Sequence, residues 1–280
     1  MNNGKIGSLS TEDIQYIQTQ YQNRLDTGMS TKKTGVVICL DVLGWKNHTR
    51  PNQIENLTNL TASLESEILQ DTLRTTDNKE NNDIAIINLS DTIFIFISDS
   101  SPYFFVNVFK ALAKFVNNAF NYSFAFRGAI SYGEYTHNKT KNIFTGEAVY
   151  EAATYCESTE WAGIIITGSL AKELLKENDY ATLEKINLIR YEAIPYKEEF
   201  LKKHSKCHGF LALNPNRIAI GPLGEYMITE NLIDKYTRYF SNGTGNIPNH
   251  LKEKYQNTID FIDFISKFSK SSQDSYERHT

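Results

Sequence analysis

Two apolar, strand-like segments near the start of the chain constrain its fold most, because each contains a single aspartate. The first, residues 36–45, reads VVICLDVLGW and contains Asp41. The second, residues 84–97, reads IAIINLSDTIFIFI and contains Asp91. A carboxylate at the end of a buried strand is costly unless a cation, a hydrogen-bond network or protonation offsets its desolvation. If the fold brings the two strands together, the two carboxylates can share a divalent metal ion.

The composition is that of a folded protein with one large domain, or one domain and a substantial extension. The chain has 280 residues, of which 40% are hydrophobic and 22% charged. A net charge of −4 without a basic run argues against nucleic acid as a partner. The apolar runs are too short to span a bilayer, and the amino terminus lacks a signal-peptide core, so no membrane partner is expected.

The cysteines indicate the compartment. Cys39, Cys156 and Cys207 are odd in number and have no metal-like spacing. Reduced thiols in a cytoplasmic protein are the simplest interpretation.

Hydrophobic periodicity and turn signals predict alternating strands and helices. We expect strands over 34–43, 83–88, 92–98, 123–135, 163–167, 186–194 and 209–213. We expect helices over 10–27, from Pro51 through Leu69, from Pro102 through Val116, and over 146–156, 170–175 and 251–268. The last helix is either a packing arm or a dimerisation element, and the last dozen residues are expected to be disordered.

A hairpin inside an alternating pattern favours an α+β sandwich of the ferredoxin-like kind over a purely parallel sheet. The expected organisation is an N-terminal helical segment (1–33), a central domain (34–213) and a partly helical C-terminal extension (214–280). A split βαβ fold places the first strand beside the later hairpin. Asp41 at its strand end can then face Asp91 at the hairpin tip.

Two carboxylates at one end of a sheet suit Mg²⁺ or Mn²⁺, which prefer oxygen ligands. Paired ions suit phosphoryl displacement, with one ion activating the attacking oxygen and the other holding the leaving phosphates. The backbone N–H groups of Leu43, Gly44, Trp45 and Lys46, in the turn that follows, can hold phosphate oxygens. The plainer alternatives remain open at this point: Asp41 as a carboxylate that caps a turn, and Asp91 as an ordinary hairpin residue.

The motifs, taken in order, resemble those of the class III nucleotidyl cyclases. Residues 37–45 resemble their first metal motif, and residues 89–94 their second, a Gly-Asp hairpin in which Ser90 here replaces the glycine. Residues 126–134 resemble the next strand, residues 145–153 the start of the dimer-interface helix, and residues 157–166 its end and the following strand. The resemblance runs from about residue 34 to residue 213 and implies a class III cyclase sandwich.

The resemblance also implies the roles of individual residues. Asp41 and Asp91 would be the catalytic metal ligands for two Mn²⁺ or Mg²⁺ ions, with a backbone carbonyl from Val42. Arg127 is a candidate phosphate or base contact, or else a structural ion pair at a strand edge. Lys46 can meet the triphosphate or be solvated, and Tyr150 can stack on the base or pack in a dimer interface.

Departures from the purine cyclases narrow the expectation. Their transition-state Asn and Arg correspond to Tyr150 and Thr154 here, and their purine-selecting Lys corresponds to Ile87. The divergent helix, with the strands on either side of it, resembles the pyrimidine cyclases of the Pycsar antiphage systems. That family implies a homodimer with its site at the subunit interface, which makes cyclic UMP or cyclic CMP from UTP or CTP to act on a separate effector protein.

Two other hypotheses remain open: an adenylate or guanylate cyclase with rearranged base contacts, and a degenerate domain that binds nucleotide without turnover. Between the pyrimidine substrates, UTP is favoured slightly by its frequency in the family. Asp41→Ala and Asp91→Ala are expected to abolish turnover while leaving the fold intact, because removing a metal-binding carboxylate relieves charge repulsion.

Overall fold

The computed structural model describes residues 31–44, 52–75, 84–98, 102–122, 124–138, 143–176, 178–204, 211–215, 217–219, 226–228, 232–241 and 246–277. The helix predicted over 10–27 lies outside these ranges. Within them, no helix is long and apolar enough to cross a bilayer.

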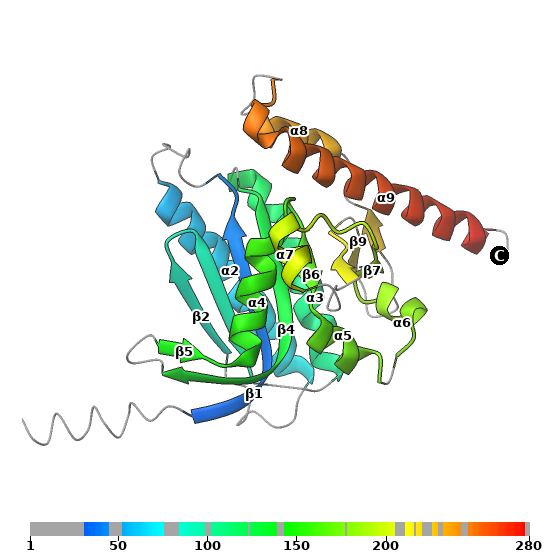
Figure 1. Ribbon diagram of the computed structural model, residues 1–280. Coiled ribbons are helices and arrows are strands. Elements are labelled where there is room, and N and C mark those ends of the chain that lie inside the picture. The colour runs from blue at the N-terminus through cyan, green and yellow to red at the C-terminus, as the bar shows by residue number, and fades with distance from the viewer. Residues whose placement is uncertain are drawn as a thin grey trace, which may run out of the picture.

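The strands and helices alternate along the chain (Figure 1). The strands are β1 (Thr31–Val42), β2 (Ile84–Leu89), β3 (Thr92–Ile97), β4 (Phe126–Asn138), β5 (Ile143–Thr145), β6 (Ile164–Ile166), β7 (Leu188–Arg190), β8 (Leu211–Leu213), β9 (Arg217–Ala219) and β10 (Tyr226–Ile228). The helices are α2 (Gln53–Thr75), α3 (Pro102–Ala119), α4 (Glu147–Ser158), α5 (Gly168–Leu174), α6 (Tyr180–Glu184), α7 (Glu198–Lys203), α8 (Leu232–Phe240) and α9 (Lys252–Glu277), with 3-10 turns η2 (Phe120–Tyr122) and η3 (Asn249–Leu251).

The main sheet has the order β2-β3-β1-β4-β6-β8-β7, and β5 pairs with the outer part of β4. Strand β1 runs antiparallel to both of its neighbours, β3 and β4. The first six elements, β1-α2-β2-β3-α3-β4, therefore form the split βαβ arrangement of a ferredoxin-like sheet. The predicted α+β sandwich is confirmed, and it places the end of β1 beside the β2–β3 hairpin.

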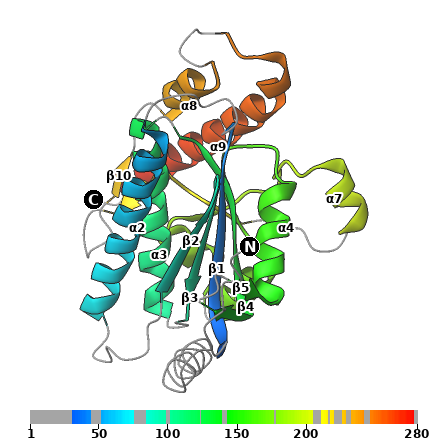
Figure 2. The same ribbon diagram turned by 90° about the vertical axis from the view of Figure 1, so that its left-hand side faces the viewer.

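Helices cover both faces of this sheet, which explains the continuous apolar run of β1. Val36, Ile38 and Leu40 point to the face covered by α2 and α3. Val37 and Cys39 point to the opposite face, which is covered by α4 (Figure 2). The sheet thus separates two apolar cores, and its central strand belongs to both.

The C-terminal helices belong to the core on the α4 side. Phe261, Ile262 and Ile265 of α9 are buried there, together with Leu232 and Phe240 of α8. Helix α9 therefore packs on the domain as an arm, one of the two roles expected from the sequence. The expectation of disorder after residue 268 is wrong up to Glu277, because no glycine or proline ends the helix before that residue.

Two other local expectations need correction. The strand predicted over 186–194 contains only Leu188–Arg190, because a turn follows at 192–193. Ile54 of α2 has the helical spacing of a core residue, but it is 76% exposed. The apolar positions that follow it, Leu57, Leu60 and Leu64, are buried as expected.

Candidate active site

Asp41 lies near the end of the central strand. The ladder pairs it with Thr92 of β3 on one side and with Arg127 of β4 on the other. Side chains alternate between faces along a strand, so Asp41 shares the α4 face with Val37 and Cys39. Its side chain is only 18% exposed, and a carboxylate this buried requires compensation.

Arg127 supplies that compensation. Its Nε donates to Oδ2 of Asp41 at 2.7 Å, and its own side chain is 15% exposed. Its Nη1 donates to the carbonyls of Glu157 at 3.4 Å and Thr159 at 3.3 Å, at the end of α4. Burial lowers the pKa of the guanidinium, but the charge and hydrogen bond of Asp41 outweigh that effect and raise the pKa overall. Of the two alternatives for Arg127, the structure contains the ion pair.

Asp41 opens into a hollow of about 290 Å³ between the sheet and α4, which we call the Asp41 hollow. It combines one ion-paired carboxylate with two cations, Arg127 and Lys197, and a second carboxylate, Glu157. The lining residues are Cys39, Asp41, Leu89, Thr92, Phe94, Arg127, Ala153, Cys156, Glu157 and Lys197. The sequence did not point to Lys197, because this lysine precedes the short helix α7 without a motif of its own.

Asp91 lies in the tight turn between β2 and β3. Leu89 pairs with Thr92, so Ser90 and Asp91 form a two-residue hairpin turn. Ser90 has φ of +60°, the left-handed region in which glycine is favoured. The backbone carbonyl of Asp91 accepts a hydrogen bond from the amide of Val42 at 2.9 Å. The hairpin turn is thus tied to the residue after Asp41, although Asp91 is not among the residues that line the Asp41 hollow.

Two hydrogen bonds of Leu43 also hold the turn after β1. The amide of Leu43 donates to the carbonyl of Ala125 at 2.9 Å, so this amide is already occupied. The carbonyl of Leu43 accepts a hydrogen bond from the hydroxyl of Tyr239 in α8. Gly44 has φ of +70°, which lets the chain reverse there. The predicted phosphate contacts Trp45 and Lys46 lie outside the described residues.

The hydroxyl of Tyr239 remains protonated at neutral pH. Burial raises its pKa well above the usual value, a backbone hydrogen bond at Ala125 opposes the rise, and the charge of Asp41 adds to it. Tyr239 is therefore a permanent hydrogen-bond donor to the turn that follows Asp41. No feature of its local sequence indicated this contact, which spans 196 residues.

Two thiols lie below the carboxylate. Cys39 and Cys156 are free, buried and part of the lining of the Asp41 hollow. Their mutual hydrogen bond and burial raise the pKa of the Cys39 thiol well above its usual value. The Cys39 thiol therefore stays protonated at neutral pH. Cys207 lies outside the described residues.

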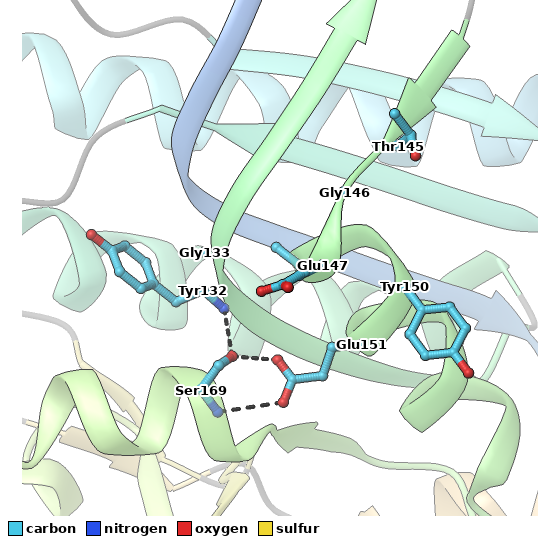
Figure 3. Close-up of a pocket in the computed structure, with 9 residues that line it drawn as sticks. Tyr132, Gly133, Thr145, Gly146, Glu147, Tyr150, Glu151 and Ser169 are labelled. Carbon is cyan, nitrogen blue, oxygen red and sulfur yellow. Dashed lines mark hydrogen bonds between the residues drawn. The ribbon is translucent and has the colours of Figure 1, made fainter.

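Tyr150 lies elsewhere on α4, in a second hollow of about 560 Å³ (Figure 3). Beneath it, the amide of Tyr132 donates to Oγ of Ser169 at 3.1 Å, and that hydroxyl donates to Glu151. The ring of Tyr150 points away from this cluster and is 69% exposed. Within one protomer, Tyr150 and Asp41 therefore line different hollows.

The oxygen donors can be tested against a metal ion. Among the described residues, no group of three or more His, Cys, Asp and Glu side chains is arranged to hold one. Two aspartates lie close together in the strand pairing: Asp41 pairs with Thr92, and Asp91 is the residue before Thr92. Mg²⁺ is commonly bound by one or two carboxylates, with substrate phosphates and water completing its shell. Two carboxylates alone would leave the rest of such a shell to phosphates and water.

No family model and no curated protein matches the chain. Solved structures with a similar fold include the adenylyl cyclase CyaB from P. aeruginosa, with 14% identity over 69% of this chain and 100% of that chain, at a TM-score of 0.44. The catalytic core of a rhodopsin-guanylyl cyclase with converted specificity, in complex with ATPalphaS, is also similar. It is 8% identical over 66% of this chain and 97% of that chain, with a TM-score of 0.47. The guanylyl cyclase Cya2 is 8% identical over 71% of this chain and 99% of that chain, with a TM-score of 0.42. At these identities and TM-scores, the likenesses identify neither the family nor the activity of this chain.

Proposed function

We propose that the chain is a nucleotidyl cyclase that converts a pyrimidine nucleoside triphosphate, UTP or CTP, into the cyclic monophosphate and pyrophosphate. The observation that carries the proposal is the position of Asp41. It lies at the end of strand β1 and lines a hollow that also contains Arg127 and Lys197. The next residue, Val42, donates its backbone amide to the carbonyl of Asp91 in the hairpin turn. This arrangement is the one that the ordered cyclase-like motifs imply.

In the proposed reaction, the 3′-hydroxyl oxygen forms a bond to the α-phosphorus, and the bond from that phosphorus to the bridging β-oxygen breaks. Pyrophosphate leaves, and the hydroxyl proton is released to water. Two Mn²⁺ or Mg²⁺ ions held by Asp41, Asp91 and the carbonyl of Val42 would activate the hydroxyl and neutralise the phosphates. Lys197 would bind the triphosphate, and Arg127 would orient Asp41 through their hydrogen bond.

The proposal of a pyrimidine substrate rests on Ile87, the residue at the position of the base-selecting lysine of purine cyclases. Ile87 stands where purine cyclases carry a base-selecting lysine, and it is 7% exposed and apolar. It cannot donate a hydrogen bond to a purine. The contact by which purine cyclases select their base is therefore missing at this position, and contacts of that kind can discriminate strongly between substrates. UTP is favoured over CTP on family frequency, and the product would act as a second messenger on a separate effector in antiphage defence.

The proposed homodimer would bring α4 of one protomer to the Asp41 hollow of its partner. Tyr150 supports this arrangement, because its side chain on α4 is 69% exposed. Exposed aromatic and aliphatic side chains of this size are frequent in protein interfaces. Tyr150 would then reach the nucleotide across the interface and take the place of the purine-cyclase asparagine.

A second candidate function is a nucleotide-binding domain without turnover. The Asp41–Arg127 ion pair favours it, because a carboxylate already neutralised by a guanidinium has less affinity for a metal ion. The retention of both aspartates favours the enzyme, since simple binding needs them less.

The test is to incubate the purified full chain with each of the four ribonucleoside triphosphates and Mn²⁺, and to identify products by mass spectrometry. Cyclic UMP or cyclic CMP is the expected product. Asp41→Asn and Asp91→Asn should abolish it, while Glu134→Gln, which changes an exposed carboxylate on β4, should not. Cyclic AMP or cyclic GMP alone would refute the pyrimidine assignment. Nucleotide binding without any cyclic product would establish the second candidate.

A further inference from the structure

The C-terminal extension contacts the protein on both sides of Asp41. Helices α8 and α9 lie together across the end of the sheet where β1 terminates (Figures 1 and 2). Helix α8 touches the turn after Asp41, and α9 touches the segment that directly follows Thr159, an acceptor of Arg127. The extension therefore contacts two segments that adjoin the proposed catalytic site.

Helix α8 is anchored firmly enough to act as a rigid support. Leu232, Tyr236 and Phe240 are each 3% exposed or less, and the ring of Tyr236 packs edge-on against Phe120 at a centroid distance of 4.6 Å. The next face of the helix directs Tyr239 to the carbonyl of Leu43. A side chain held by a packed helix positions its hydrogen-bond partner more accurately than one on a loop.

Helix α9 forms hydrogen bonds with the segment between α4 and β6. Oγ1 of Thr258 accepts a hydrogen bond from the amide of Ala162 at 2.9 Å, and Nδ2 of Asn257 donates to the carbonyl of Glu160 at 2.9 Å. This segment directly follows Thr159, whose carbonyl accepts a hydrogen bond from Arg127. Both partners of the Asp41–Arg127 pair are thus supported from the extension.

Among the described residues, hydrogen bonds of the backbone and of one side chain hold the turn after Asp41. Two join backbone groups: Val42 to Asp91 and Leu43 to Ala125. A further bond comes from the Tyr239 side chain, so it can be removed by substitution without altering the backbone. We infer that Tyr239 is a positioning residue of the active site, which holds the turn so that Asp41 and the carbonyl of Val42 keep the geometry that metal binding requires. This inference rests on the proposed cyclase function.

The experiment compares Tyr239→Phe with Tyr255→Phe in the full chain. Both substitutions remove one phenolic hydroxyl from the extension. The hydroxyl of Tyr255 shares a hydrogen bond with Oγ1 of Thr237 at 3.0 Å, within the extension itself. The readouts are hydrogen exchange of the peptide over residues 37–44, Mn²⁺ affinity in the presence of UTP or CTP by electron paramagnetic resonance, and kcat with KM for cyclisation. Circular dichroism establishes that each variant is folded.

Tyr239→Phe should speed exchange in the peptide and weaken Mn²⁺ binding about fivefold, the loss expected for one hydrogen bond. It should lower kcat at least as much, because a small misplacement of reacting groups is costly, while KM for nucleotide changes less. Tyr255→Phe should change none of these quantities. A Tyr239→Phe variant with wild-type exchange, Mn²⁺ affinity and kcat would overturn the inference.

The two proposals fail in different ways. If the wild type makes no cyclic product but Tyr239→Phe still weakens Mn²⁺ binding, the cyclase function is refuted and the positioning role stands. If the wild type is active and Tyr239→Phe is equally active, the cyclase function stands and the positioning role is refuted. If the wild type neither binds Mn²⁺ nor turns over, both are refuted.

Discussion

Asp41→Ala is expected to destabilise the protein, contrary to the expectation from sequence that it leaves the fold intact. The substitution removes the counter-charge of a guanidinium that is only 15% exposed. Breaking a fully buried ion pair by removing one partner costs about 3–5 kcal/mol. Arg127 keeps two backbone carbonyls and some solvent contact, so we expect a loss of about 2–3 kcal/mol in the free energy of unfolding.

A double-mutant cycle isolates the pairwise contribution. Asp41→Ala, Arg127→Met and the double variant would be unfolded in urea at pH 7, without metal. At an effective dielectric constant of about 20, unit charges about 4 Å apart attract by about 4 kcal/mol before their desolvation is counted. Allowing for the remaining solvent contact, we expect a coupling energy of about 2 kcal/mol.

The Lys32–Glu134 pair provides a matched control. Its nitrogen and oxygen are also 2.7 Å apart, but its side chains are 68% and 59% exposed. The same cycle with alanine at each position should give a coupling below about 1 kcal/mol, because water screens exposed pairs. If the two cycles gave equal coupling energies, burial would not strengthen the Asp41–Arg127 pair, and the reasoning would be refuted.

Three further predictions concern the surroundings of the site. Ser90→Gly should raise the free energy of unfolding by about 0.5–1 kcal/mol, measured in urea, because glycine adopts the left-handed turn without a Cβ penalty. A decrease would show that the serine side chain stabilises the turn. Thr258→Val should cost about 1–3 kcal/mol in the same assay, since the buried amide of Ala162 loses its acceptor, and an unchanged value would contradict that hydrogen bond. Cys39 and Cys156 should resist iodoacetamide at pH 8 in the folded protein, because burial and the raised pKa of Cys39 suppress thiolate, and rapid labelling by mass spectrometry would contradict this.

The centre of the fold could be predicted because each element there carries its own signal. The run of β-branched and apolar residues before Asp41 indicated a strand buried on both faces, and the short turn at Ser90 indicated a hairpin. The split βαβ order then followed from the sequence of elements. Ile54 had the right spacing but lies at the first turn of α2, where the helix projects beyond the core.

The environment of the site could not be predicted, because it depends on pairing between distant strands and helices. Arg127 was identified as either a ligand contact or an ion-paired residue, but its partner follows only from the register of β1 with β4. Lys197 and Tyr239 reach the site from segments without recognisable motifs. The boundary predicted near residue 213 also separates residues that share one apolar core, such as Phe261 and Trp161, whose ring centroids are 4.6 Å apart.

The contact between Tyr239 and Leu43 has a consequence for synthesis of the chain on the ribosome. The two residues are 196 positions apart, so the turn beside Asp41 emerges long before the hydroxyl that holds it. At about 5–20 residues per second, the delay is on the order of 10–40 s. During that interval the nascent chain can build the sheet from β1 to β4, but the turn beside Asp41 lacks the hydrogen bond from Tyr239. The site therefore acquires its final geometry only after Tyr239 has been synthesised and α8 has packed.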